Sequence, residues 1–205
     1  MLKETIYTAN WKLDGNRKTA RDWVNGFTSN EGRELIRPEN RIIVAPPVEL
    51  LSTVADQIAA YGLPIAIAAQ NLNIEWMGIK HTGEANTAAL IADCAEYVIL
   101  GHPETRDDKL LTVDDVNRQL DVARSHNLKP IVCVTSIEQA QAVSQHDPHF
   151  PGIIAYEPIA NIGTGQAAKP SIANSVCSVI KGMYPFATML YGGSVDYSNI
   201  KELLS

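Results

Sequence analysis

The chain has 205 residues and a formal net charge of −6, with 45% hydrophobic and 20% charged residues. This size fits one domain, residues 1–205, around a single core, and the composition is ordinary for a globular protein. The negative charge argues against a nucleic-acid or anionic-membrane partner, because such surfaces repel an acidic protein. No apolar run reaches the length of a membrane span, and the N-terminus has no long apolar segment typical of a signal peptide. We therefore expect a cytoplasmic protein.

The three cysteines, Cys94, Cys133 and Cys177, are an odd number and lie far apart in the chain. This pattern predicts reduced, mostly buried thiols rather than a disulfide framework or a zinc site. No His/Cys cluster has the spacing of metal ligands, and no glycine fingerprint with a following acidic residue opens a βαβ unit. The sequence therefore predicts that the protein uses no metal and no organic cofactor.

Short β-rich apolar runs alternate along the chain with segments of helical spacing. Alternation of this kind indicates βαβ units and a parallel sheet covered on its faces by helices. In the last long helical segment, the spacing predicts one buried face formed by Ile172, Val176, Val179 and Ile180. The seven predicted strands are residues 5–10, 41–45, 65–70, 97–101, 130–134, 152–157 and 187–192.

Polar residues follow most of these strands directly. The first strand runs into Asn10 and Lys12, the fourth into His102, the sixth into Glu157 and the seventh into Ser194. Polar groups at the carboxyl ends of successive parallel strands are typical of the catalytic face of a (β/α) barrel. An open doubly wound sheet would gather its ligand groups at one switch point. The spread over several strands favours the barrel.

The segment 155–165 combines features of a catalytic base beneath a closing loop. An apolar run ends at Glu157, and Pro158 stiffens the exit because its ring fixes φ and restricts the residue before it. A small loop then reaches Gly163 and Gly165, which are free to adopt positive φ. The alternative is an ordinary strand-to-helix turn whose glutamate is merely solvated, since short motifs have many false matches.

Seven short motifs follow one another along the chain: Asn10-Trp-Lys12, Ala69-Gln-Asn71, Thr82-Gly-Glu84, Gly101-His102 with Glu104, Tyr156-Glu157-Pro, Ile162-Gly-Thr-Gly165 and Tyr191-Gly-Gly-Ser194. In this order they resemble the triosephosphate isomerase family, from residue 5 to about residue 204. The resemblance implies a TIM barrel that interconverts dihydroxyacetone phosphate and D-glyceraldehyde 3-phosphate through an enediol, in glycolysis and gluconeogenesis.

The resemblance implies a role for each catalytic position. Glu157 would be the base, and His102 a neutral imidazole that donates to the enediolate oxygen. Lys12 would supply fixed positive charge, Asn10 would orient Lys12, and Glu104 would be a partner of Lys12. Residue type alone leaves simpler interpretations open: a structural histidine, a solvated lysine, a turn asparagine and a first-turn helix acid.

The family's substrate phosphate is held by backbone N–H groups, and the resemblance assigns Gly163 and Ser194 to this role. Small residues allow the close backbone approach that a phosphate needs. Gly192 and Gly193 would adjust as the loop 158–165 closes, or simply allow the turn after the seventh strand.

The segment 71–84, from Asn71 to Glu84, resembles the loop that projects into a neighbouring subunit in this family. This favours a homodimer, with Thr82 near the partner's active site. The alternative is that the segment folds back on its own barrel. Its apolar residues would be costly to leave in water: Leu72, Ile74, Trp76, Met77 and Ile79.

Several departures from the family pattern qualify this resemblance. Pro103 stands where the family has serine and cannot donate a backbone N–H, while Arg106 is interpreted as a structural ion-pair partner. The chain reaches Ser205 within the expected seventh helix, so the eighth β/α unit is missing from this sequence. A seven-stranded parallel sheet leaves unpaired edges at its first and seventh strands. We expect a partner, a rearrangement or further chain to cover these edges.

Two alternative functions stay open: an isomerase of another phosphosugar, and a catalytically impaired or inactive relative that serves as a binding or scaffold protein.

Overall fold

The computed structural model describes residues 4–74, 88–161 and 167–204. The chain forms two compact units, residues 1–99 with 122–129 and residues 100–121 with 130–205. The expectation of one domain spanning residues 1–205 stays a prediction.

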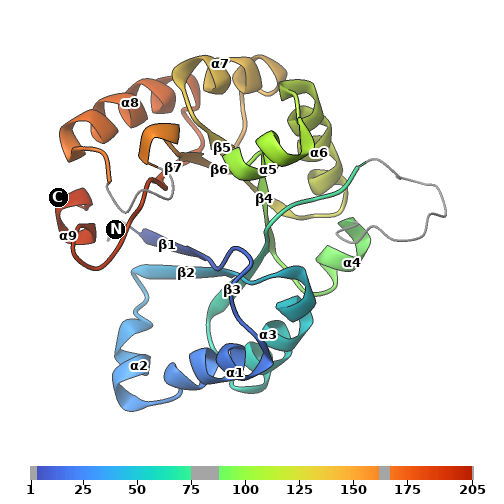
Figure 1. Cartoon of the computed structure of the whole chain (residues 1–205), viewed down its shortest axis with the longest axis vertical. Helices are drawn as coiled ribbons and strands as arrows, with labels where there is room; N and C mark the ends of the chain where they lie inside the picture. The colour runs from blue at the N-terminus through green and yellow to red at the C-terminus, as the bar shows by residue number, and fades with distance from the viewer. Residues whose placement is uncertain (1–3, 75–87, 162–166, 205) are drawn as a thin grey trace. The chain divides into compact units, whose positions relative to one another are not determined.

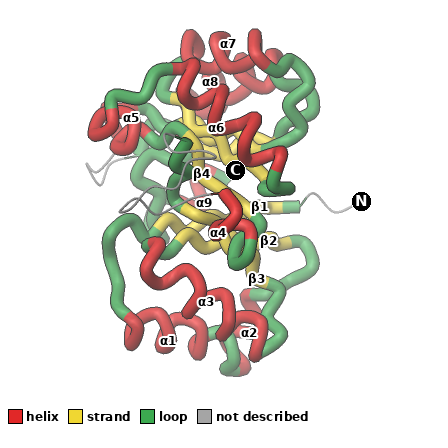
Figure 2. The backbone as a smooth tube through the Cα atoms, turned by 90° about the vertical axis from the view of Figure 1, so that its right-hand side faces the viewer, coloured by secondary structure: helices red, strands yellow, loops and turns green. Residues whose placement is uncertain are grey.

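The first unit alternates strands with helices that cover them. Its parallel strands β1, β2 and β3 have α1, α2 and α3 on one face (Figure 1 and Figure 2). The elements are β1 (Thr5–Asn10), α1 (Arg17–Gly26), α2 (Asn30–Leu35), β2 (Asn40–Ala45), α3 (Val48–Ala60), β3 (Ile65–Ala69), α4 (Ala88–Ala92) and β4 (Tyr97–Leu100), whose last residue belongs to the second unit.

Helix α1 shows how the sequence determines these elements. The Asn16 side chain accepts hydrogen bonds from the backbone N–H groups of Lys18 and Thr19. The Thr19 hydroxyl in turn accepts one from the Asn16 backbone N–H, which completes a capping box. Ala20 and Val24, four residues apart, are fully buried. The start of the helix and its core-facing stripe are therefore both encoded locally.

The second unit repeats the alternation, and its α7 and α8 lie side by side in both views (Figure 1 and Figure 2). The register of its parallel strands brings Val134, Tyr156 and Tyr191 level at their carboxyl ends. Its elements are α5 (Pro103–Lys109), α6 (Val113–Ser125), β5 (Lys129–Val134), α7 (Ile137–His146), β6 (Ile153–Tyr156), the 3-10 turn η1 (Ile159–Asn161), α8 (Pro170–Met183), β7 (Thr188–Tyr191) and α9 (Ile200–Leu203). The end of α6 from residue 122 on and the first residue of β5, Lys129, belong to the first unit.

The strand order is the chain order, β1 to β7, and the strand pairs are parallel. A doubly wound sheet reverses its order at a switch point, and no such reversal occurs among the described strands. The chain therefore has the α/β TIM-barrel fold with seven strands, as predicted. Each predicted strand agrees with the observed one to within one residue at either end.

The buried face predicted for α8 is wrong in part. Ile172 and Val179 are 53% and 48% exposed, whereas Ala173 and Ile180 are buried. Residues 173 and 180 are seven apart and share one stripe, and the residue before each lies about 100° away around the helix. The buried stripe contains the small residue Ala173, and the prediction missed it because it relied on the large apolar residues.

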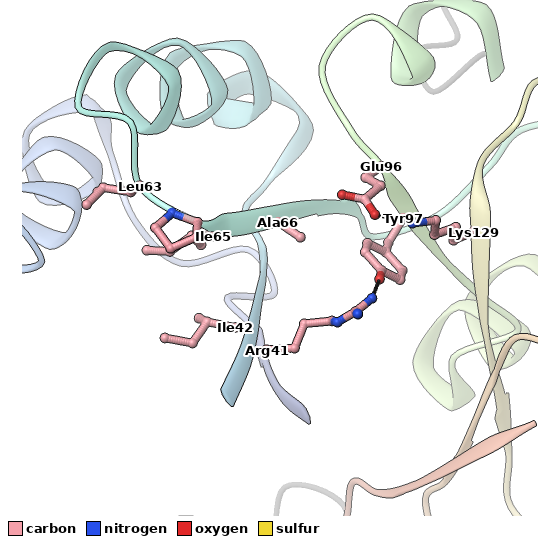
Figure 3. Close-up of a pocket in the computed structure, with 9 residues that line it drawn as sticks. Arg41, Ile42, Leu63, Ile65, Ala66, Glu96, Tyr97 and Lys129 are labelled. Carbon is pink, nitrogen blue, oxygen red and sulfur yellow. Dashed lines mark hydrogen bonds and ion pairs between the residues drawn. The ribbon is translucent and has the colours of Figure 1, made fainter. Parts of the chain in front are cut away.

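A cavity of about 380 Å³ lies in the first unit at the N-terminal ends of its strands (Figure 3). Arg41 donates to the Tyr97 hydroxyl at 2.7 Å, and the Lys129 ammonium lies 5.4 Å from the centre of the Tyr97 ring. Arg41 also pairs with Glu4 at 2.9 Å, and Lys129 pairs with Glu96. These half-exposed pairs neutralise the cations of the cavity wall. We interpret these pairs as weakly stabilising contacts between the N-terminal ends of neighbouring strands.

All three cysteines are free thiols. Cys133 is buried, whereas Cys94 and Cys177 are half-buried, so the prediction of mostly buried thiols is wrong in part. In the part of the chain that the structure describes, no helix combines the length and apolar character needed to cross a membrane.

Candidate active site

Glu157 lies directly after β6 at the edge where the strands of the second unit end. Its backbone N–H donates to the Val134 carbonyl at 2.9 Å, so the main chain holds it in register with β5. The residue is only 9% exposed. A carboxylate that is this buried and aimed at other polar groups is a candidate for chemistry rather than a solvated turn residue.

His102 faces Glu157 across the site. Its Nε2 lies 3.2 Å from Glu157 Oε2, and the histidine is 7% exposed. The other ring nitrogen, Nδ1, accepts a hydrogen bond from the Glu104 backbone N–H at 3.3 Å. Because Nδ1 acts as the acceptor, the hydrogen-bond pattern assigns the proton of a neutral ring to Nε2. The imidazole therefore presents an N–H donor toward Glu157.

The start of α5 explains why the histidine is held this way. His102 is the N-cap of α5, and Pro103 occupies the first helical position. A proline is well suited to that position because its missing N–H would have no intrahelical partner. The N–H that Pro103 lacks is therefore not needed by the helix.

Glu104 lies in the first turn of α5, where an acid is favourable. Its Oε2 is 3.9 Å from His102 Nδ1, and its side chain is 48% exposed. The structure thus places Glu104 beside the histidine. Its predicted role as a partner of Lys12 stays a prediction.

Gly192 packs against Glu157. A Cβ at this position would lie 2.8 Å from Glu157 Cγ and 3.0 Å from its Oε1, which is closer than real Cβ contacts. The Gly192 N–H donates to the Tyr156 carbonyl at 2.9 Å, so its backbone is fixed to β6. Glycine is therefore required here so that the main chain can approach the carboxylate.

The end of β7 contacts one flank of the segment between residues 161 and 167, and the loop after β7 contacts the other. Ser194 in the loop, at φ +51°, donates its hydroxyl to the Asn161 carbonyl. The hydroxyl of Tyr191, the last residue of β7, accepts a hydrogen bond from the Ala168 N–H at 2.7 Å. Gly193 permits this, because a Cβ there would lie 2.4 Å from the Tyr191 hydroxyl oxygen.

A second polar group lies in the first unit, at the end of β1. The Lys12 N–H donates to Asn10 Oδ1 at 2.9 Å, and Lys12 has φ +55°, which is unusual for a residue with a side chain. Gln70 Nε2 donates to the carbonyls of Lys12 at 2.6 Å and Ala45 at 2.8 Å. These bonds stabilise the strained backbone at Lys12, a feature typical of functional positions.

The structure therefore brings together His102, Glu104, Glu157 and Gly192 in the second unit, and Asn10 with Lys12 in the first. It places Ser194 against Asn161. Gly163 and Gly165 lie outside the described residues, as do Gln166, Trp76, Met77, Ile79, Thr82 and Glu84. Of the apolar residues in the segment 71–84, Leu72 and Ile74 are described, and Leu72 is fully buried whereas Ile74 is half-buried. The described residues contain no cluster of three or more His, Cys, Asp and Glu placed to hold a metal.

Cys133 is a site residue that sequence reasoning did not assign. Its thiol donates to Glu157 Oε1 at 3.4 Å, and the residue is 1% exposed. Burial, followed by the negative charge of Glu157 and this hydrogen bond, raises the pKa of the Cys133 thiol well above its usual range. The thiol therefore stays protonated and acts as a donor. Its position next to the end of β5 was the available signal.

The sequence of the chain is similar to those of known proteins along its whole length. The model of the family described as triosephosphate isomerase matches residues 5–205. A triosephosphate isomerase of Synechococcus sp. (strain JA-3-3Ab) is 35% identical over 225 residues, which cover 100% of this chain and 86% of that protein. One from Gloeobacter violaceus is 34% identical, covering 100% and 89%. One from Alkaliphilus oremlandii is 33% identical, covering 100% and 90%.

Proposed function

The chain belongs to the triosephosphate isomerase family, and on that premise we propose that Glu157 and His102 carry out its isomerisation of triose phosphates. The activity is that of an isomerase interconverting dihydroxyacetone phosphate and D-glyceraldehyde 3-phosphate, a step of glycolysis and gluconeogenesis. The comparisons do not favour an inactive binding or scaffold relative, and they do not favour an isomerase of another phosphosugar.

Glu157 acts as the general base. It takes a proton from the carbon beside the substrate carbonyl and returns a proton to the neighbouring carbon, so that an enediol lies between the two steps. His102 donates its Nε2–H to the oxygen that becomes negative. The ring suits this role because its N–H already points toward the atom on which negative charge develops, so the donor does not have to reorient during the reaction. The 3.2 Å contact between Nε2 and Oε2 is the observation that carries the proposal.

The remaining site residues hold and stabilise the substrate. Lys12 supplies positive charge to the enediolate and the phosphate, and Asn10 orients it through the hydrogen bond at the end of β1. Backbone N–H groups of Gly163, Gly193 and Ser194 bind the phosphate. Gly192 lets the main chain reach the base. Loop 158–165 excludes water from the enediol.

The experiment that tests this function is isomerisation of D-glyceraldehyde 3-phosphate in a coupled assay, together with binding of a phosphate-bearing enediolate mimic. We expect turnover and tight binding of the mimic. An absence of both would instead support the scaffold alternative.

We expect Gly192→Ala to lower kcat/KM by about 10- to 100-fold, because the added Cβ displaces the Glu157 carboxylate from its position. The matched control is Gly182→Ala on α8, where an added Cβ meets nothing within 4 Å. The control keeps full activity and gains stability, since alanine is the better helix former. Equal activity of the two variants would refute the role given to Gly192.

A homodimer is the second part of the proposal. Leu13, which follows Lys12 directly, is 93% exposed, and contact with a second subunit would remove its side chain from water. We propose that the segment 71–84 of a second copy covers this region. The expected solution mass by light scattering is twice that of the chain, and Leu13→Asp shifts it toward the monomer. A monomeric wild-type protein would contradict this proposal.

We further propose that the protein is cytoplasmic and that residues 1–205 form one domain. Its acidic charge and free thiols support the first statement, and the continuous strand order from β1 to β7 supports the second.

A further inference from the structure

Arg106, on α5, is a buried cation to which the mechanism above gives no role. The residue is 8% exposed, and burial lowers its pKa, although an arginine side chain stays protonated in proteins. Its Nη2 has no hydrogen-bond partner in residues 4–74, 88–161 and 167–204. The ion-pair partner expected from the sequence is likewise not found among these residues. A buried charge without a carboxylate partner is costly and requires an explanation.

The first link runs from Arg106 to the backbone of the catalytic histidine. Arg106 Nε donates to the Gly101 carbonyl at 2.8 Å, and the Arg106 backbone N–H donates to the His102 carbonyl at 2.9 Å. These carbonyls belong to the two peptide groups on either side of the His102 Cα. Gly101 has φ +64°, and a Cβ there would lie 2.8 Å from Arg106 Nη2. The guanidinium is thus packed directly against the peptide that sets the direction of the imidazole.

The second link runs from Arg106 to the base through Cys133. Cys133 of β5 lies close enough to the guanidinium that Arg106 partly opposes the rise in the pKa of the thiol. The same thiol donates to Glu157 Oε1 at 3.4 Å. Glu157 faces His102, the N-cap of α5, and Glu104 lies on the far side of that ring. Arg106 is thus a buried cation beside the thiol that donates to Glu157.

We propose that Arg106 is a positioning residue for the isomerisation: its guanidinium fixes the peptide group that joins Gly101 to His102, and its buried charge lies beside the Cys133 thiol that donates to Glu157. This proposal rests on the proposed function. Arg106 does not touch the substrate and acts through the two residues that do.

Three substitutions of Arg106 separate its contact with the backbone at His102 from its effect on Glu157. Arg106→Lys retains a charge and a donor, Arg106→Gln retains a donor without the charge, and Arg106→Met retains neither. The measurement is kcat/KM as a function of pH for each folded variant, with Glu157→Gln assayed in parallel. Arg118→Gln is the charge control, since Arg118 is a 68% exposed surface cation paired with Asp115.

The expected result is a shift of the acid limb of the profile. In Arg106→Gln and Arg106→Met the limb moves to higher pH by roughly 0.5–1 unit, because a carboxylate that loses a nearby cation ionises less readily. In Arg106→Lys and Arg118→Gln it stays where the wild-type limb lies. In Arg106→Met, kcat falls by about a further 10-fold relative to Arg106→Gln, because His102 is no longer held in direction.

Superimposable acid limbs in all variants would overturn the proposal, as would a failure of all three variants at position 106 to fold, since either result assigns Arg106 a purely structural role. A wild-type protein without turnover would overturn the proposed function, and the present inference with it. A wild-type enzyme that depends on Glu157 but is insensitive to the charge at position 106 would overturn the present inference alone.

Discussion

We expect Glu157→Gln to lower kcat by on the order of 10³-fold or more, with a much smaller change in KM. The amide is nearly the same size as the carboxylate, so packing against Gly192 is retained, but it cannot accept a proton from carbon. The measurement is steady-state isomerisation of D-glyceraldehyde 3-phosphate. Because the lost interaction acts in the transition state, the loss is in kcat.

The matched control for this variant is Glu138→Gln, at a fully exposed position in the first turn of α7. It removes the same charge from the same unit but leaves turnover at the wild-type level. If Glu157→Gln retained a tenth or more of the wild-type kcat, another group would be the base and the mechanism proposed for Glu157 would be wrong.

The second large effect is expected for His102→Gln, which lowers kcat by about 10²- to 10³-fold. Glutamine supplies a neutral N–H donor, but on a flexible chain that lacks the ring held between the Glu104 N–H and Glu157. The donor is therefore no longer fixed toward the oxygen on which charge develops. The same assay measures the effect.

His149→Gln is the control for this substitution, because His149 is exposed and its ring lies beside Phe186, 5.8 Å away, in a loop after α7. We expect it to leave kcat unchanged. A His102→Gln enzyme with the wild-type kcat would show that the developing charge is stabilised elsewhere, and Lys12 would then be the leading candidate.

The strands could be predicted closely because a parallel sheet buries both of its faces. The run from Ile153 to Tyr156 is continuous and apolar, and it ends where Glu157 and Pro158 begin. The helix faces were harder to predict. In α8 the buried stripe contains Ala173, a residue too small to stand out among Ile172, Val179 and Ile180. Which residues of α8 are buried depends on how the helix faces the sheet, and the apolar pattern of the helix alone does not determine this.

The site was predictable where a polar residue stands alone at a strand end, as Glu157 and His102 do. Cys133 was not, because a buried thiol has the same sequence signal whether it fills space or donates to a carboxylate. Arg106 was interpreted as half of an ion pair, since arginine is rarely buried without one. Gly192 was predicted from the resemblance, but its reason, the approach of the main chain to Glu157, emerges only from the geometry.

The central claim is that Glu157 removes a proton from carbon, and solvent exchange tests it most directly. Dihydroxyacetone phosphate is incubated with the enzyme in D₂O, and deuterium at its carbons is followed by NMR. We expect enzyme-dependent incorporation by the wild-type protein and none above the uncatalysed rate with Glu157→Gln. Incorporation at the wild-type rate by Glu157→Gln would contradict it.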